Sequence, residues 1–401
     1  MTRKEFLERS LTMGIGLPFL TGWLTSCADD VNASQSFEVN FTGRVLVIGA
    51  GAAGMVAGHL LKQHGIDFQI IEALPRFGGR VRKDESLADF PIDLGAEWLH
   101  TDPDIFAQLL NDETTNGNIE LITYSPETMY VWKNGELRKR NFYTNFYSEY
   151  KFKRSTWYDF FDQHIVPGIA DNMVFNSPVA EVNYSGNEVV VQTQSGATYR
   201  GDRVIVTVPL TVLKQQSITF TPAMPASKFE ALDTVDMPDG VKVFMRFTER
   251  FYPDITFEGG IFKNLSDSSG EKIYYDAAFR KDTNANVLGL FTVGAPATVY
   301  ATQPNEEALT RYILDELDEM FDGQARQYYQ SHVIQNWSKE PYIQGSYSHY
   351  NTYNMRDELA APINNRVYFA GETYAPEDDI ATVHGAGLSA FATVEQLLKT
   401  P

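Results

Sequence analysis

The stretch that decides the fold is RVLVIGAGAAGMVAGHLLKQH, residues 44–64. Residues 45–48 form a continuous apolar run, which is typical of a strand buried on both faces of a parallel sheet. A glycine-rich turn follows over residues 49–54, and residues 55–64 then carry a helical pattern. A second apolar run occupies residues 68–71. Together these segments predict a βαβ unit.

The glycine-rich turn matches the pattern G-x-G-x-x-G at Gly49, Gly51 and Gly54. The first glycine permits the tight turn, and the second lets the backbone approach a pyrophosphate at the helix N-terminus. The third allows close packing of helix and strand. Glu72, at the end of the second strand, is placed to accept hydrogen bonds from ribose hydroxyls. A glycine-rich turn with an incidental acid is the alternative, but strand, turn, helix and acid together favour a dinucleotide site.

Length and composition indicate a folded protein of about two domains. The chain has 401 residues, of which 43% are hydrophobic and 21% charged, and this excludes a disordered or collagen-like chain. The net charge of −19 speaks against a large duplex-binding surface, because phosphate binding needs clustered Lys and Arg. The acidity is compatible with a cationic substrate, but solubility alone explains it more simply.

Further runs along the chain predict the remaining elements. The fold class is therefore α/β, with a second region interleaved in the sequence. Helices are expected over 105–110, 157–169, 306–321 and 385–398, and strands over 188–192, 197–200, 203–209, 241–247, 272–279, 287–293 and 366–370.

The N-terminal segment indicates an export signal. A basic start is followed by a mostly apolar stretch, residues 11–24, which glycines and a proline interrupt. Residues 24–27, Leu-Thr-Ser-Cys, resemble a bacterial lipobox, and residues 2–7 resemble a twin-arginine signal with Lys4 in place of the second arginine. We expect a signal peptide over 1–27, a tether over 28–43, and an exported periplasmic or membrane-anchored lipoprotein. A disordered tail with an accidental cysteine is the alternative.

Cys27 is the only cysteine, which excludes an intramolecular disulfide and a Cys-based metal site. The seven histidines show no ligand spacing, so no metal is expected.

Several blocks beyond Glu72 resemble the flavin-containing amine oxidase family. They cover residues 44–398, and their C-terminal part is most similar to polyamine oxidases and lysine-specific histone demethylases. The blocks are EALPRFGGR (72–80), DLGAEWLH (93–100), VTVPL (206–210), GSYS (345–348), VYFAGE (367–372) and ATVHGAGLS (381–389).

The resemblance implies a Rossmann-type FAD-binding domain interleaved with a smaller α+β substrate domain. The FAD-binding domain would comprise residues 44–100, 178–215 and 362–401, and the substrate domain residues 101–177 and 216–361. Carried over to this sequence, the cofactor-binding residues are Gly49, Gly51, Ala53, Gly54, Glu72, Ala73, Gly79, Arg80, Gly95, Ala96, Glu97, Trp98, Val179, Gly371, Glu372, Thr382 and Val383.

The activity that the resemblance implies is oxidation of a small-molecule amine at its C–N bond. A hydride equivalent passes to flavin N5, and dioxygen reoxidises the flavin to give hydrogen peroxide. Because no cysteine lies between residues 372 and 384, where monoamine oxidases form a thioether, the FAD is expected to be noncovalent. No nucleic-acid partner is expected, and a membrane only through the lipid anchor.

The family also places a lysine near flavin N5. A gap-free match puts Arg280 at that position, whereas a one-residue slip puts Lys281 there; two surface charges at a strand end are the alternative. Tyr347 and His349 are expected to contribute to the substrate surface, because Thr382 stands where many members carry an aromatic residue.

Two further interpretations stay open at the level of sequence. The first is an L-amino acid oxidase, with Arg280 holding the carboxylate, or a desaturase on the same fold. The second is a low-turnover flavin-binding partner protein, because the 77 residues between His100 and Pro178 are fewer than the family's usual insertion.

Overall fold

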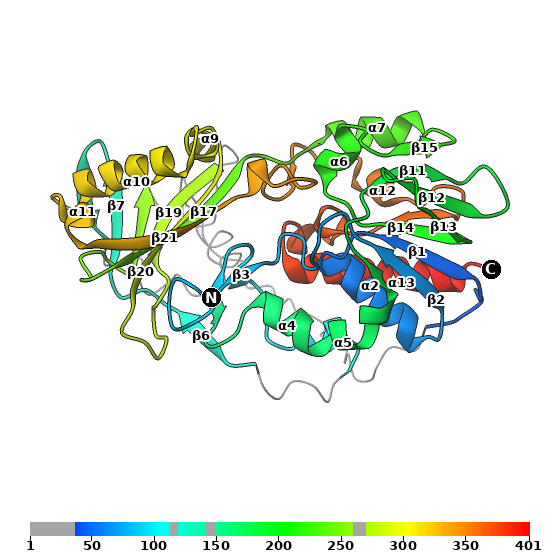
Figure 1. The fold of residues 1–401 in the computed structure, drawn as a ribbon, viewed down its shortest axis with the longest axis horizontal. Helices are drawn as coiled ribbons and strands as arrows, with labels where there is room; N and C mark the ends of the chain where they lie inside the picture. The colour runs from blue at the N-terminus through cyan, green and yellow to red at the C-terminus, as the bar shows by residue number, and fades with distance from the viewer. Residues whose placement is uncertain (1–36, 113–118, 141–148, 260–269) are drawn as a thin grey trace, which may run out of the picture.

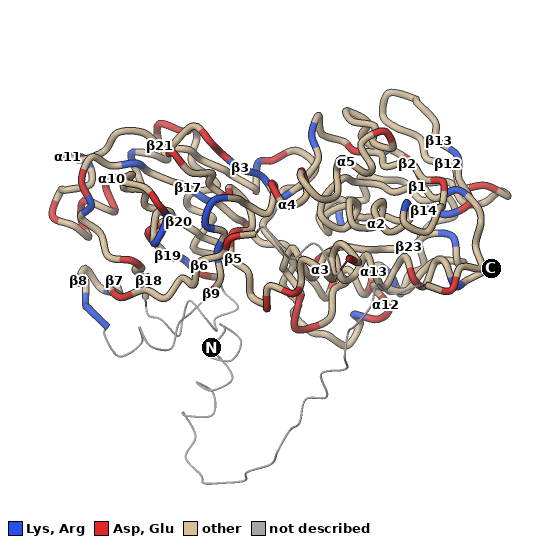
Figure 2. Tube along the Cα trace, turned by 90° about the horizontal axis from the view of Figure 1, so that it is seen from below, with Lys and Arg blue, Asp and Glu red and all other residues tan. Residues whose placement is uncertain are grey.

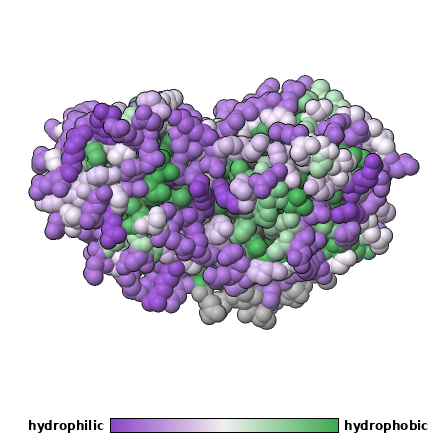
Figure 3. All heavy atoms as spheres, viewed as in Figure 1, coloured by the Kyte–Doolittle hydropathy of each residue, from purple (hydrophilic) through white to green (hydrophobic). Residues whose placement is uncertain are grey.

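The computed structural model describes residues 37–112, 119–140, 149–259 and 270–401. The expected signal peptide, with Cys27, lies outside the described residues. The described chain forms two lobes side by side (Figure 1), and the space-filling view shows a notch between them at the upper edge (Figure 3). No described helix is long and apolar enough to cross a membrane.

A five-stranded parallel sheet forms the centre of one lobe. Its central strand β1 is buried on both faces, because Val45 and Val47 pack into one core layer and Leu46 and Ile48 into the other. The strand order is β10 (Met173–Val174), β2 (Asp67–Ile71), β1 (Arg44–Ile48), β14 (Arg203–Val206) and β23 (Val367–Phe369).

Helices cover one face of this sheet, and a second sheet covers the other (Figure 1). The helices are α2 (Ala52–Gln63), α13 (Val383–Lys399), α3 (Ile105–Leu110), α4 (Trp157–His164) and α5 (Val166–Ile169). The second sheet has the order β13 (Thr198–Gly201), β12 (Val189–Thr193), β11 (Val179–Asn183) and β15 (Thr219–Thr221). Beside it lie α6 (Leu210–Lys214), α7 (Ala226–Asp233) and α12 (Arg356–Ala360). The expected Rossmann-type domain is therefore present.

The other lobe is built on a seven-stranded sheet. Its order is β21 (Tyr329–Asn336), β17 (Gly240–Phe247), β20 (Asn286–Gly294), β19 (Gly270–Asp276), β18 (Ile255–Glu258), β7 (Met129–Lys133) and β8 (Glu136–Lys139). Helix α10 (Glu306–Met320) lies along this sheet with α9 (Ala295–Ala301) and α11 (Gln324–Tyr328) (Figure 1). The apolar side chains of α10, among them Leu309, Ile313 and Leu317, pack into the core beneath it.

Small sheets complete the structure between and beside the lobes. They are β5 (Trp98–Leu99), β9 (Glu149–Phe152) and β6 (Leu121–Tyr124); β3 (Lys83–Asp84) with β4 (Ile92–Asp93); and β16 (Val235–Asp236) with β22 (His349–Tyr350). Basic and acidic residues are interspersed along the trace in both lobes (Figure 2).

The domain boundary expected at residues 101–177 differs from the structure. Strand β10 joins the parallel sheet, and α3, α4 and α5 pack into the same core as α2. Likewise β15 and α7 lie with the Rossmann-type lobe, although residues 216–361 are expected in the substrate domain. The reason is that the apolar faces of these short elements are covered only by the first lobe.

Candidate active site

One cavity of about 1060 Å³ runs between the lobes. One end is formed by the glycine-rich turn after β1, and the other by one face of the seven-stranded sheet. Ligand pockets usually span roughly 300–1,000 Å³, so this cavity has room for a dinucleotide-sized group together with a small substrate.

The glycine-rich turn shapes the nucleotide end. Gly49 has a φ of +105°, which favours glycine. A Cβ built on Gly54 would lie 1.9 Å from the Gly49 carbonyl oxygen, so helix and turn pack as the motif predicts. A Cβ on Gly51 would meet no atom within 4 Å, which shows that this backbone lies open to the cavity.

Glu72 is held in place by the backbone around it. Its Oε2 accepts a hydrogen bond from the Ala50 N–H at 2.6 Å, and its Oε1 accepts one from the Leu74 N–H at 2.8 Å. Burial raises the pKa of this carboxyl, and the backbone hydrogen bonds oppose that shift. Each carboxylate oxygen has a second lone pair, so Glu72 can also accept from ribose hydroxyls.

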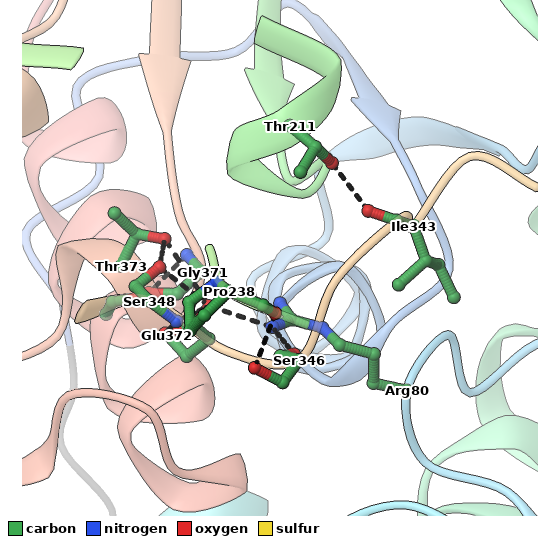
Figure 4. Close-up of polar contacts among 10 residues, drawn as sticks. Arg80, Thr211, Pro238, Ile343, Ser346, Ser348, Gly371, Glu372 and Thr373 are labelled. Carbon is green, nitrogen blue, oxygen red and sulfur yellow. Dashed lines mark hydrogen bonds and ion pairs between the residues drawn. The ribbon is translucent and has the colours of Figure 1, made fainter. Parts of the chain in front are cut away.

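A polar network joins the nucleotide end to the last strand and helix (Figure 4). Arg80 Nη1 donates to Glu372 Oε1 at 2.9 Å and to the Ser346 carbonyl oxygen at 2.8 Å. Ser348 donates to the same carboxylate from its Oγ at 2.9 Å. Thr211 in α6 donates to the Ile343 carbonyl oxygen, so the segment that carries Ser346 is fixed at both ends.

Helix α13 points its N-terminus into the cavity. Thr382 is its N-cap residue and accepts a hydrogen bond from the Gly385 N–H at 2.9 Å. Thr382 and Val383 both line the cavity. The N-terminal ends of α2 and α13 both face this space and have no acidic residue in the first turn. Open backbone at Gly51, two helix N-termini and the Glu72 carboxylate therefore fit an FAD.

The sheet of the other lobe forms the second end of the cavity. Strand pairing places Lys242, Phe291, Ile273 and Phe257 in one row across β17, β20, β19 and β18. Paired residues of antiparallel strands point to the same face. All four line the cavity, so this row forms a mostly apolar floor with one cation.

Lys242 is the cavity lysine, and the sequence interpretation missed it. Its ammonium donates to the Asp93 and Gly95 carbonyl oxygens at 2.8 and 3.0 Å and to Glu97 Oε2 at 2.8 Å. Burial lowers the pKa of Lys242, and Glu97 opposes that shift. A lone lysine inside the apolar run of β17 is the signal that could have revealed it.

The two expected catalytic residues and one expected substrate residue do not line the cavity. Arg280, at a turn with φ of +54°, is half exposed and pairs with Glu127 at 3.3 Å. Lys281 lies behind the cavity wall near Glu97, and its Nζ is 4.7 Å from the Phe90 ring centre. His349 pairs with β16 in a two-stranded sheet. The expectation that Arg280 or Lys281 faces the flavin is therefore wrong, as is the placement of His349.

The other expected residues lie at the cavity or directly beside it. Gly54 packs beneath the turn, and Tyr347 lines the substrate end. The remaining expected cofactor-binding residues all line the cavity: Gly49, Gly51, Ala53, Glu72, Ala73, Gly79, Arg80, Gly95, Ala96, Glu97, Trp98, Val179, Gly371, Glu372, Thr382 and Val383.

A buried carboxylate, Glu271, also lines the substrate end, and the sequence interpretation did not include it. It pairs with Val293 in the row next to that of Lys242, on the same face of the sheet. It is 7% exposed, and Tyr347 donates a hydrogen bond to its Oε1 at 3.1 Å. An aromatic hydroxyl and a carboxylate thus lie together in an otherwise apolar region.

Fold and cavity together define the class of Rossmann-type dinucleotide-binding proteins. The model of the flavin containing amine oxidoreductase family matches residues 165–398, more than half of the chain, and that of the NAD(P)-binding Rossmann-like domain matches residues 47–112. The chain belongs to the flavin containing amine oxidoreductase family.

Known proteins of similar sequence and structure agree with this assignment. Mouse (Mus musculus) lysine-specific histone demethylase 1B is 24% identical over 86% of this chain and 52% of its own length. Polyamine oxidase 1 of Zea mays is 32% identical over 56% of this chain and 44% of its own length. The chain thus spans about half the length of these two relatives. A solved structure of a putrescine oxidase variant matches 90% of this chain and 100% of its own chain. The two structures superpose with a TM-score of 0.73 at 14% sequence identity, and they therefore share a fold.

Proposed function

We propose that this protein oxidises a small-molecule amine at its C–N bond with a noncovalent FAD. The observation that carries the proposal is a single cavity that joins a dinucleotide end to an apolar floor containing Lys242. When bound, the flavin accepts the hydride equivalent and passes two electrons to dioxygen, giving hydrogen peroxide. The amine is left as an imine, which water hydrolyses.

The residues of this chain bind, orient and shield the reacting groups. Phe257, Ile273 and Phe291 provide an apolar floor that excludes water and holds the substrate carbon against the cofactor. Lys242 is fixed on that floor by three acceptors, one for each N–H of an ammonium. A fixed positive charge there favours the build-up of negative charge on the reduced cofactor.

The charges of the substrate end support an amine that carries a second cation. Glu271 in β19 lies two strands away from Lys242 in β17 and is displaced by two residues along the strand. The Cα atoms of the two residues are therefore roughly 12 Å apart. That carboxylate would bind a distal ammonium, as in a diamine such as putrescine. Among the described lining residues the Lys and Arg side chains are Arg80 and Lys242, and both have protein acceptors. Because both described cations already have protein acceptors, the described lining favours an amine over an amino acid as substrate.

The test is an anaerobic screen of the purified protein. We expect aliphatic amines to bleach the oxidised flavin absorbance, diamines to do so at lower concentration than monoamines, and amino acids to have no effect. Bleaching by amino acids alone would support the amino acid oxidase, and bleaching by none would support the low-turnover partner protein. Acid precipitation should release the FAD into the supernatant; flavin in the pellet would contradict noncovalent binding.

We also propose that the chain is exported and anchored through an acylated Cys27. The support is the lipobox-like sequence of residues 24–27. Cys27→Ser should remove the lipid and release the protein from the membrane fraction, as measured by fractionation of the source cells. Retention of this variant in the membrane fraction would contradict the anchor.

A further inference from the structure

A triad of buried charges lies along the cavity wall and behind it. We call Lys151, Glu97 and Lys242 the buried triad. Glu97 is its centre, because Oε1 lies 2.5 Å from Lys151 Nζ and Oε2 lies 2.8 Å from Lys242 Nζ. All three are buried: Lys151 is 1% exposed, Glu97 6% and Lys242 3%. Glu97 and Lys242 line the cavity, whereas Lys151 lies behind them.

Lys151 is fixed by an aromatic cage. Its Nζ lies 4.6 Å from the ring centre of Trp98, 5.0 Å from that of Tyr124 and 4.8 Å from that of Tyr275. Ring faces attract cations at such distances, most strongly where water is excluded. The Tyr275 hydroxyl also donates to Glu97 Oε2. The cage therefore holds the cation and its carboxylate partner in one arrangement.

The triad carries one excess positive charge. Burial disfavours a charged Glu97, but Lys151 and then Lys242 outweigh it and hold the pKa of Glu97 at about 2. Glu97 therefore stays ionised at neutral pH and compensates one of the two lysines with which it forms ion pairs. If Lys151 were absent, Glu97 would compensate Lys242 alone, and the triad itself would carry no net charge.

We propose that Lys151 is a positioning residue of the flavin site, which holds Glu97 against Lys242 and supplies the excess positive charge that raises the flavin reduction potential. The physical reason is that a cation in a poorly hydrated site stabilises an anionic reduced cofactor over a neutral oxidised one. The inference rests on the proposed function only in that a flavin fills the cavity. Lys151 itself does not line the cavity, so it acts on the flavin through Glu97 and through its charge.

The experiment is a charge cycle measured on the FAD-loaded full chain. Lys151→Met leaves the triad neutral, Glu97→Gln leaves two excess positive charges, and the double variant restores one. We expect the midpoint potential of the flavin to be highest in Glu97→Gln, lowest in Lys151→Met, and similar in the wild type and the double variant. Each step should change the ratio of reduced to oxidised flavin at a fixed potential about tenfold, which is about 30 mV for two electrons.

Two more variants separate charge from packing. Lys151→Arg keeps the cation and should keep the wild-type potential. Lys272→Met is the matched control, because Lys272 is also a buried strand lysine, 3.1 Å from Glu258, and does not line the cavity. This control should leave the potential unchanged.

Several results would overturn the proposal. They are equal potentials in Lys151→Met and the wild type, or shifts of Lys151→Met and Glu97→Gln in the same direction. If Lys151→Met does not fold, the comparison of Glu97→Gln with the double variant still decides, and equal potentials there would refute it. A wild-type protein without flavin would end this inference and the proposed function together, whereas a flavoprotein inert toward amines would end the function alone.

Discussion

Glu72 shows how one side chain serves two purposes at the nucleotide end. It holds the Ala50 and Leu74 amides and faces the cavity at the same time. Glu72→Ala should weaken FAD binding roughly 10–100-fold, because hydrogen bonds to a charged group contribute about 1.5–3 kcal/mol. Fluorescence titration of the apoprotein with FAD measures this.

Two variants test that interpretation of Glu72. Glu72→Gln keeps an acceptor, so its FAD affinity should lie between that of Glu72→Ala and that of the wild type. Glu188→Ala removes an exposed carboxylate that pairs with Arg200 at 3.4 Å and should leave FAD affinity unchanged. Wild-type affinity in Glu72→Ala would contradict the assignment of this residue to the ribose.

We expect Glu271 to set the preference for diamines over monoamines by binding the distal ammonium. Glu271→Gln removes the charge and keeps the shape, so KM for a diamine should rise roughly 10–100-fold while KM for a monoamine of equal length stays the same. Tyr347→Phe removes only the hydroxyl that donates to Glu271 and should have a smaller effect. An equal loss for both substrates would show that Glu271 does not recognise the second cation.

At this scale the sequence was informative where a motif fixes backbone geometry. The glycines of the turn, Glu72 and the α13 N-terminus could be predicted, because turn geometry and helix ends depend on local sequence. Lys242 and Glu271 could not, because their place depends on which strands become neighbours in the seven-stranded sheet. The choice of Arg280 or Lys281 failed because both residues lie beyond the end of β19, at Asp276, and neither lines the cavity.

The C-terminal end of helix α12 is capped by a lysine of helix α7. Lys228 in α7 is 3% exposed, and its Nζ donates to the carbonyl oxygens of Glu358, Leu359 and Ala361 at 2.8, 2.9 and 2.6 Å. These carbonyls lie at the C-terminal end of α12, where no intrahelical donor exists. The lysine thus joins two short helices that would be marginal alone.

Lys228→Met should lower the free energy of unfolding by about 2–4 kcal/mol, because three carbonyls lose their donor in a buried place. Urea unfolding followed by circular dichroism measures the loss. The control is Lys399→Met, which removes a lysine from an exposed pair with Glu395 at 2.7 Å and should cost less than about 0.5 kcal/mol. Equal midpoints for the two variants would contradict the capping function of Lys228.

Elements with strong periodicity were predicted well. Strands β17, β19 and β20 and helices α10 and α13 lie within a few residues of the expected ranges. Strands β7 and β18 were missed because they are short, and β21 because its sequence is largely polar; such segments become strands when neighbours supply their hydrogen bonds. Tertiary pairing also explains why β10 joins a sheet that the sequence did not assign to it.

Because the cavity lies between the two lobes, a bound cofactor should stabilise the folded molecule as a whole. Its walls come from both lobes, and Arg80 donates a hydrogen bond to the Ser346 carbonyl oxygen at the cavity (Figure 4). Removing the flavin should therefore lower the melting temperature by several degrees, because a ligand at a hundred times its Kd adds about 2.7 kcal/mol. Differential scanning calorimetry of the apoprotein, the holoprotein and the reconstituted protein tests this; identical melting temperatures would contradict it.

The strand order of the parallel sheet determines when the nucleotide pocket can be completed during synthesis of the chain. Strand β23 is the neighbour of β14, and α13 packs beside α2, yet both late elements follow β1 by some 300 residues. A ribosome that adds roughly 5–20 residues per second needs tens of seconds to cover that interval. During this time the nascent nucleotide pocket lacks Glu372 and the Thr382 helix start. We therefore expect cofactor loading to follow translation, and a chain that terminates before β23 to retain no flavin.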